Sequence, residues 1–166
     1  MTVVKAPIAG TLVPLSQVPD PVFAQEMLGP GFAIFAPWSS AEGASPDPIT
    51  AVSPVSGTVA ALKPHAFIVK TSGGFSVLVH LGIDTVTGPA EQFEALKSPT
   101  GAHWQTGDAV AAGSPMITWT PQSAESRNEL VMVTLLDLPA TTSISRDYPE
   151  GTTVTNATDV ISVALP

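Results

Sequence analysis

The stretch Lys63–Val86, KPHAFIVKTSGGFSVLVHLGIDTV, decides how the chain is organised around its chemistry. From Phe75 to Leu81, apolar residues alternate with others, and this two-residue period is typical of a β-strand with two distinct faces. A second short apolar run, 67–69, precedes residues 71–74 (Thr-Ser-Gly-Gly), whose glycines tolerate the positive φ of a tight turn. The stretch therefore predicts a β-hairpin.

This hairpin brings together two of the chain's three histidines, His65 and His80. A turn centred on Ser72 and Gly73 places His65 directly opposite His80, and a turn centred on Gly73 and Gly74 makes the pair diagonal. Both registers leave the imidazoles on one face, with their Cβ atoms roughly 5 to 8 Å apart. A slip of one residue would separate them, so the prediction depends on the register.

Two facing histidines can ligate a metal, transfer protons or phosphoryl groups, or be polar residues on a solvated strand. The neighbours of His80 favour a functional pair. His80 lies in an apolar strand and is followed by a turn, Gly82 to Thr85, that carries the carboxylate of Asp84. Nothing in the structure of a strand end requires that combination.

Composition limits the class of protein. A chain of 166 residues predicts one domain, 1–166, and 17 prolines with 13 glycines suit short strands joined by turns. There is no apolar run long enough for a membrane span, no cysteine and no signal-peptide pattern, so a cytoplasmic location without direct membrane insertion is expected. The net charge of −8 argues against nucleic acid and allows a basic protein partner.

An internal repeat predicts how the strands are related. Residues 6–12 (APIAGTL) recur as residues 53–59 (SPVSGTV), and residues 107–117 are a weaker match to residues 151–161. A fold built from paired, related β-motifs explains these spacings better than a solenoid does. Further predictions are a short helical turn within 18–29, strands at 31–35 and 130–138, and one helical turn within 91–96.

Motifs for other chemistries are absent: the sequence has no nucleotide-binding GxxxxGKS loop, no Gly-x-Ser-x-Gly elbow and no HExxH. The histidine pair is suited to a phosphocarrier, in which a neutral imidazole attacks phosphorus and a second donor contacts the phosphoryl oxygens. We assign His80 as nucleophile and His65 as donor, and interpret His103 as a surface residue. The expected hydrophobic rim consists of Phe32, Phe35, Phe67 and Phe75.

The segments VLVHLGIDTV and KPHAF, and the fifteen-residue step from His65 to His80, resemble the active-site segments of glucose-family IIA components of the bacterial sugar phosphotransferase system. The similarity covers nearly the whole chain. It implies an all-β fold, an antiparallel β-sandwich or barrel of duplicated motifs with little helix. It also implies that His80 accepts a phosphoryl group from the phosphocarrier protein HPr and passes it to the cysteine of a IIB domain during sugar uptake.

In the same resemblance, His65 is the second active-site histidine and Asp84 lies on the docking rim, facing an arginine of HPr. Lys63, Gly82 and Phe67 are the further candidates for phosphoryl or partner contacts. No metal and no cofactor are expected.

Two positions depart from the family's pattern. Lys63 stands where a threonine is usual, and Pro30 stands where a second rim aspartate is usual, so the rim is expected to be less acidic. Lys63 is two residues before His65 and would lie on the same strand face, where its ammonium could stabilise a phosphoryl group. The other interpretation of Lys63 is a solvated lysine.

Two other functions stay open. The domain could regulate a transporter or metabolic enzyme through its phosphorylation state instead of feeding a sugar. A zinc peptidase can share this general architecture, but the sequence lacks its ligand set. The sequence does not specify the sugar, because that choice belongs to the partner membrane domains.

Overall fold

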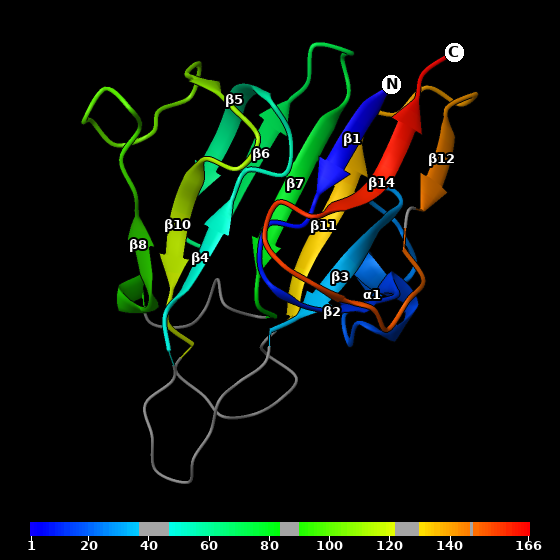
Figure 1. The fold of residues 1–166 in the computed structure, drawn as a ribbon, viewed down its shortest axis with the longest axis horizontal. Helices are drawn as coiled ribbons and strands as arrows, with labels where there is room; N and C mark the ends of the chain where they lie inside the picture. Colours follow the sequence, from blue (N-terminus) through cyan, green and yellow to red (C-terminus); the bar gives the residue numbers. More distant parts are fainter. Residues whose placement is uncertain (37–46, 84–89, 122–129, 147) are drawn as a thin grey trace, which may run out of the picture.

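The computed structural model describes residues 1–36, 47–83, 90–121, 130–146 and 148–166. Within these residues the strands form one eight-stranded and two three-stranded sheets, and all pairings are antiparallel (Figure 1). The elements are β1 (Thr2–Lys5), β2 (Gly10–Val13), η1 (Leu15–Gln17), α1 (Pro21–Ala24), β3 (Gly31–Phe35), β4 (Ile49–Val52), β5 (Gly57–Lys63), β6 (Ala66–Lys70), β7 (Ser76–Leu81), η3 (Ala90–Gln92), β8 (Phe93–Ala95), β9 (Ala109–Val110), β10 (Pro115–Trp119), β11 (Leu130–Leu136), β12 (Ser143–Arg146), β13 (Thr153–Val154) and β14 (Asp159–Ala164).

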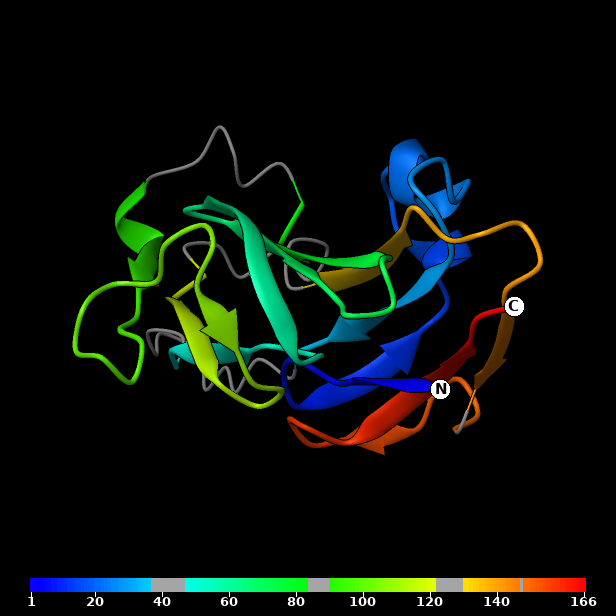
Figure 2. The same cartoon turned by 90° about the horizontal axis from the view of Figure 1, so that it is seen from above.

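The large sheet has the strand order β13-β2-β3-β11-β7-β6-β5-β9, and the small sheets are β1-β14-β12 and β4-β10-β8. Figure 2 shows the small sheets along one face of the large one. The main hydrophobic core joins these layers: it contains Phe67, Val79 and Val133 from the large sheet, and Trp119 and Ile161 from the small ones. The predicted all-β antiparallel fold with little helix is confirmed, and the large sheet is curled into a half-barrel.

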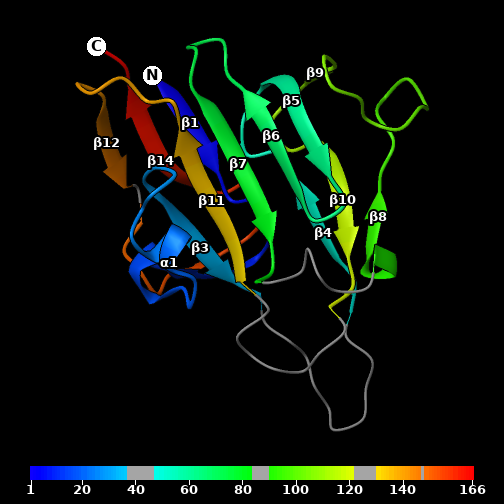
Figure 3. The ribbon, with the colours of Figure 1, turned by 180° about the vertical axis from the view of Figure 1, so that it is seen from behind.

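A second, smaller core lies on the outer face of the large sheet. Leu15, Val18 and Phe23, from the segment between β2 and β3, cluster with Ala33 and Met132 of strands β3 and β11. Figure 3 shows α1 in front of these strands.

Helix α1 confirms the helical turn expected within 18–29. The Asp20 side chain accepts a hydrogen bond from the Val22 N–H at 2.9 Å, and Pro21 occupies the first helical position, where its missing N–H costs nothing. The same cap and proline determine where Phe23 emerges on the outer face.

The sequence repeat is a structural duplication. Gly10 and Gly57 begin equivalent strands, β2 and β5, and pair with Val154 of β13 and Val110 of β9 respectively. The two halves are joined reciprocally, because the Lys5 N–H donates to the Pro54 carbonyl and the Val52 N–H donates to the Pro7 carbonyl, each at 2.9 Å. The weaker repeat therefore pairs with the stronger one in the same way in both halves.

Two expected elements differ in detail. The helical turn expected at 91–96 is wrong beyond Gln92, since Phe93–Ala95 forms strand β8 against β10. The buried strand expected at 130–138 ends at Leu136, and Asp137 follows with a left-handed φ of 59°. The helices that the structure describes are all too short to cross a membrane.

The duplicated glycines predict a stability effect. A Cβ at Gly57 would overlap the carbonyl oxygen of Lys70 on the neighbouring strand, so we expect Gly57→Ala to lower the free energy of unfolding by about 3 kcal/mol. Gly101→Ala is the control, because its surroundings are open and its φ of +86° costs only about 1 to 2 kcal/mol. Urea unfolding of both variants measures the difference, and equal losses would contradict the overlap.

Candidate functional site: a histidine pair on the outer face of the large sheet

His80 lies on β7, near the middle of the large sheet, with β6 on one side and β11 on the other. Its neighbours in the strand, Val79 and Leu81, are fully buried in the main core. The alternation of the strand therefore turns the His80 ring to the outer face, where it is half-buried. The predicted strand with two distinct faces is confirmed.

His65 reaches the same place from a turn and not from a strand. Strand β5 ends at Lys63 and β6 begins at Ala66, so Pro64 and His65 form the connection. The observed register pairs Ala66 with His80, which is one residue away from both expected registers. The hairpin loop is centred on Gly73, since Lys70 pairs with Ser76.

The expectation that such a slip separates the histidines is wrong, for a geometric reason. His65 precedes Ala66, the first residue of β6, so strand alternation does not set the direction of its side chain. The His65 carbonyl accepts a hydrogen bond from the Leu81 N–H at 2.8 Å, which fixes the turn against β7. The ring centroids of His65 and His80 are 4.8 Å apart, with an angle of 71° between the planes.

A backbone carbonyl orients His80. Its Nδ1 lies 2.9 Å from the Gly82 carbonyl oxygen, which can only accept, so Nδ1 carries the proton and donates. The lone pair of the neutral ring is then on Nε2. Gly82 is itself fixed, since its N–H donates to the Leu130 carbonyl at 2.8 Å and its φ of 78° suits glycine.

Both histidines are predominantly neutral at pH 7. Burial lowers the pKa of His80 below its ordinary value, and the charge of His65 lowers it further, against smaller opposing effects of the Gly82 hydrogen bond and of Asp20. Burial also lowers the pKa of His65, assisted by Lys63. Asp20, at the start of α1, is the acidic residue among the described ones that acts on the pKa of His80.

The aromatic side chains at the site are not the expected ones. Phe23 lies 5.2 Å from His80 and Phe93 lies 6.3 Å from His65, as ring centroid distances. The predicted rim is wrong for Phe32, Phe67 and Phe75, which are buried in the main core. Phe35 is half-buried and packs with the smaller outer core, so its place on the rim stays a prediction. Phe67 is 0% exposed, so its side chain cannot contact a partner.

The other predicted residues divide into two groups. Lys63 is exposed at the end of β5, and Gly82 supplies the carbonyl described above. Asp84 lies outside the described residues, so its place on a docking rim stays a prediction. Among the described residues, no group of three or more His, Cys, Asp or Glu side chains could hold a metal ion.

Sequence reasoning missed Asp20, Phe23 and Phe93. The first two had a signal: aspartate followed by proline is a helix start, which places the phenylalanine two positions later on the first turn. Val22, Met27 and Leu28, on the same segment as Phe23, have exposed apolar side chains, and Met27 is 68% exposed. We refer to these three residues as the apolar patch. Phe93 had no signal, because its approach to His65 depends on β8 pairing with β10.

Comparison with known proteins points to one family. Residues 2–138 match the family model described as phosphoenolpyruvate-dependent sugar phosphotransferase system, EIIA 1. The chain belongs to this family. It is thus a component of a sugar phosphotransferase system, as the resemblance implied.

Individual relatives of this EIIA chain carry consistent names. It is 34% identical to a Staphylococcus aureus glucose-specific EIIA component, over 96% of the chain and 88% of that protein. It is 35% identical to a Corynebacterium glutamicum glucose-specific EIIBCA component, over 75% of the chain and 16% of that protein. The solved glucose permease IIA of Mycoplasma capricolum matches with a TM-score of 0.72 and 25% identity, over 97% of the chain and 94% of that structure.

The electrostatics of the EIIA pair predict how each histidine titrates. His65→Gln should raise the pKa of His80, because the charge of His65 lowers it, and Lys63→Thr should raise the pKa of His65. Ring-proton NMR titration measures both shifts. Lys70→Thr, which removes the same charge at the other end of β6, should leave both values unchanged.

The same shifts predict how stability depends on pH. The unfolded chain binds protons more readily than the folded one, because both histidines have lowered pKa values in the fold. The free energy of unfolding should therefore decrease as the pH falls below the ordinary value of 6.5, and His80→Gln should make that decrease smaller. If urea unfolding of His80→Gln shows an unchanged pH dependence, the pKa of His80 is not lowered in the folded chain.

Proposed function

We propose that His80 is the phosphoryl acceptor of this EIIA component, that it is charged by phosphorylated HPr, and that it donates to the cysteine of a IIB domain. The observation that carries the proposal is the hydrogen bond from His80 Nδ1 to the Gly82 carbonyl, which leaves the Nε2 lone pair free. A neutral ring with a fixed tautomer is what in-line attack on phosphorus requires.

The transfer then proceeds in two displacements. The Nε2 lone pair forms a bond to phosphorus while the bond between phosphorus and its HPr donor atom breaks, and the HPr atom keeps that electron pair. In the second step, the IIB cysteine thiolate forms a bond to phosphorus as the bond to Nε2 breaks, which returns His80 to its neutral form. Nδ1 keeps its proton and its hydrogen bond to Gly82 throughout.

His65 is the proposed donor to the phosphoryl oxygens. Its ring is within contact of His80, and its neutral form has one N–H to donate. The positive charge of Lys63 acts on His65 and lowers its pKa. We propose that the same charge stabilises the phosphoryl group on His80. Phe23 and Phe93 flank the pair, and we propose that they limit its contact with water.

The proposed docking face for HPr and IIB surrounds this site. The apolar patch of Val22, Met27 and Leu28 lies on the segment that brings Phe23 to His80, and an exposed cluster of this kind marks a protein contact. The net charge of −8 suits a basic partner, and Asp84 is proposed to face an arginine of HPr. The name of the Corynebacterium glutamicum relative, EIIBCA, supports a IIB partner.

We further propose that residues 1–166 act as one EIIA unit in the cytoplasm, at times beside a membrane permease. The pairing of β14 with β1 and of β13 with β2 supports one unit, since both C-terminal strands lie beyond the family match at residues 2–138.

Phosphoryl transfer assays separate the roles of the two histidines. His80→Ala should accept no phosphate from phosphorylated HPr. His65→Gln should still accept, yet donate to IIB at least about tenfold more slowly, equivalent to about 1.4 kcal/mol in barrier, because its amide cannot follow the group with a change of protonation. His103→Ala should behave like the unaltered chain.

Each outcome of these assays has one meaning. Phosphate on the His80→Ala chain would refute the acceptor assignment. Loss of acceptance in His65→Gln would place His65 in the nucleophilic machinery. Acceptance by the unaltered chain with no donation to any IIB domain would favour the regulatory alternative.

The docking face has its own test. Met27→Glu places a charge in the exposed apolar patch and should slow acceptance from HPr about tenfold, through an increased KM, without changing the fold. Ile144→Glu makes the same change at an exposed apolar position on β12 and should leave the rate unaltered. Equal effects of the two substitutions would show that the patch has no specific role.

A further inference from the structure

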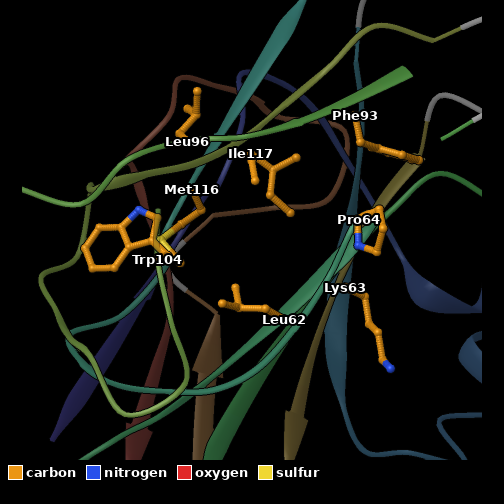
Figure 4. Close-up of a pocket in the computed structure, with 9 residues that line it drawn as sticks. Leu62, Lys63, Pro64, Phe93, Leu96, Trp104, Met116 and Ile117 are labelled. Atoms are coloured by element: carbon orange, nitrogen blue, oxygen red, sulfur yellow. The ribbon is translucent and has the colours of Figure 1, made fainter. Parts of the chain in front are cut away.

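A cavity of about 410 Å³ lies on the β8 and β10 side of the histidine pair. It forms where the end of β5 faces these strands and the loop that carries Trp104 (Figure 4). Trp104 and Phe93 lie toward opposite ends, with Leu62, Met116 and Ile117 between them. Its volume falls within the range of small-molecule sites.

The lining of this cavity determines what it can hold. Met116 and Ile117 are 2% and 3% exposed, so they form a fixed apolar floor. The Trp104 Nε1–H already donates to the Pro115 carbonyl at 2.9 Å, which leaves the indole ring as the surface it offers. The lining thus consists mainly of aromatic rings, aliphatic groups and one thioether.

Charge favours a neutral occupant. Lys63 is the charged residue among the described residues that line the cavity, and Figure 4 shows its side chain extending away from the other lining side chains. The net charge of −8 opposes the approach of an anion. A cation would find no carboxylate among the described lining residues.

Two residues connect the cavity to the histidine site. Phe93 lines the cavity, and its ring centroid lies 6.3 Å from that of His65. Pro64, also in the lining, directly precedes His65 in the turn between β5 and β6. An occupant of the cavity would therefore touch two groups that position His65.

We propose that this cavity is a second binding site, for a small neutral aromatic molecule of one or two fused rings, and that its occupancy is sensed at His65 through Phe93 and Pro64. The site is distinct from the proposed phosphoryl acceptor, and its occupation requires no phosphorylation.

Methionine methyl NMR tests the site with indole as the probe. Met116 lies in the cavity, Met27 is exposed on the apolar patch, and Met132 is buried in the smaller outer core, so the unaltered chain contains its own controls. Indole should shift the Met116 methyl in a saturable way and shift the His65 ring protons in parallel. The Met27 and Met132 methyls should move by less than a tenth as much, and indole-3-carboxylate should bind at least about tenfold more weakly.

Matched variants locate the binding. Leu62→Trp fills the cavity from its partly exposed edge and should weaken indole binding at least about tenfold, whereas Leu165→Trp, a similarly half-buried position near Gly73, should bind as the unaltered chain does. Equal shifts of Met27 and Met116, no saturation at Met116, or full binding by a folded Leu62→Trp chain would overturn the site.

Two further results test the class of occupant and the coupling to His65. Tighter binding of the carboxylate would overturn the neutral class, and saturation at Met116 without a shift at His65 would overturn the coupling. If Leu62→Trp does not fold, the comparison of Met116 with Met27 and Met132 in the unaltered chain still gives the answer.

Discussion

The pairing of β7 with β11 in the large sheet is the constraint on which the site depends. This pairing places His80 opposite Met132, and it turns Val77, Val79 and Leu81 into the main core, where all three are fully buried. A slip of one residue would exchange those side chains for Ser76, Leu78 and His80. Because burial of each large apolar side chain contributes about 1.5 to 3 kcal/mol, the register is held by the core, and the outward direction of His80 follows from it.

The outer face would be an ordinary solvated surface without the segment between β2 and β3. That segment begins helix α1 with the Asp20 cap and brings Phe23 against the His80 ring. Its apolar side chains bury part of His80, and burial is the largest cause of the lowered pKa. One short piece of chain therefore supplies the low-polarity surroundings, a nearby carboxylate and an exposed apolar patch. The strands position the histidine, and this segment contributes to the burial that lowers its pKa.

Much of this could be predicted from the sequence, because period-two alternation and the repeated Pro-x-x-Gly motifs are local signals. They indicated β7, the hairpin and the duplication, and the two histidines stood out as a pair. The register could not be fixed, since a glycine-rich loop allows several centres, and the side-chain direction of His65 depends on a turn that alternation does not describe. The prediction of the rim phenylalanines was wrong for a related reason. Phe32, Phe67 and Phe75 have the right chemistry for a rim, but only the stacking of sheets shows that they face the main core, and only the pairing of β8 with β10 brings Phe93 to His65.

The reciprocal hydrogen bonds relate the two halves of the chain by an approximate two-fold relation. Under this approximate two-fold relation, the bond from the Leu81 N–H to the His65 carbonyl has a counterpart of the same length, 2.8 Å, from the Leu135 N–H to the Pro30 carbonyl. The position equivalent to His65 is then Pro30, and the position equivalent to His80 is Thr134, whose buried hydroxyl has no hydrogen-bond partner among the described residues. The backbone scaffold of the site is therefore duplicated, but its functional side chains are not. In the other half the Pro30 ring cannot donate a hydrogen bond, and the buried Thr134 hydroxyl cannot contact a partner protein.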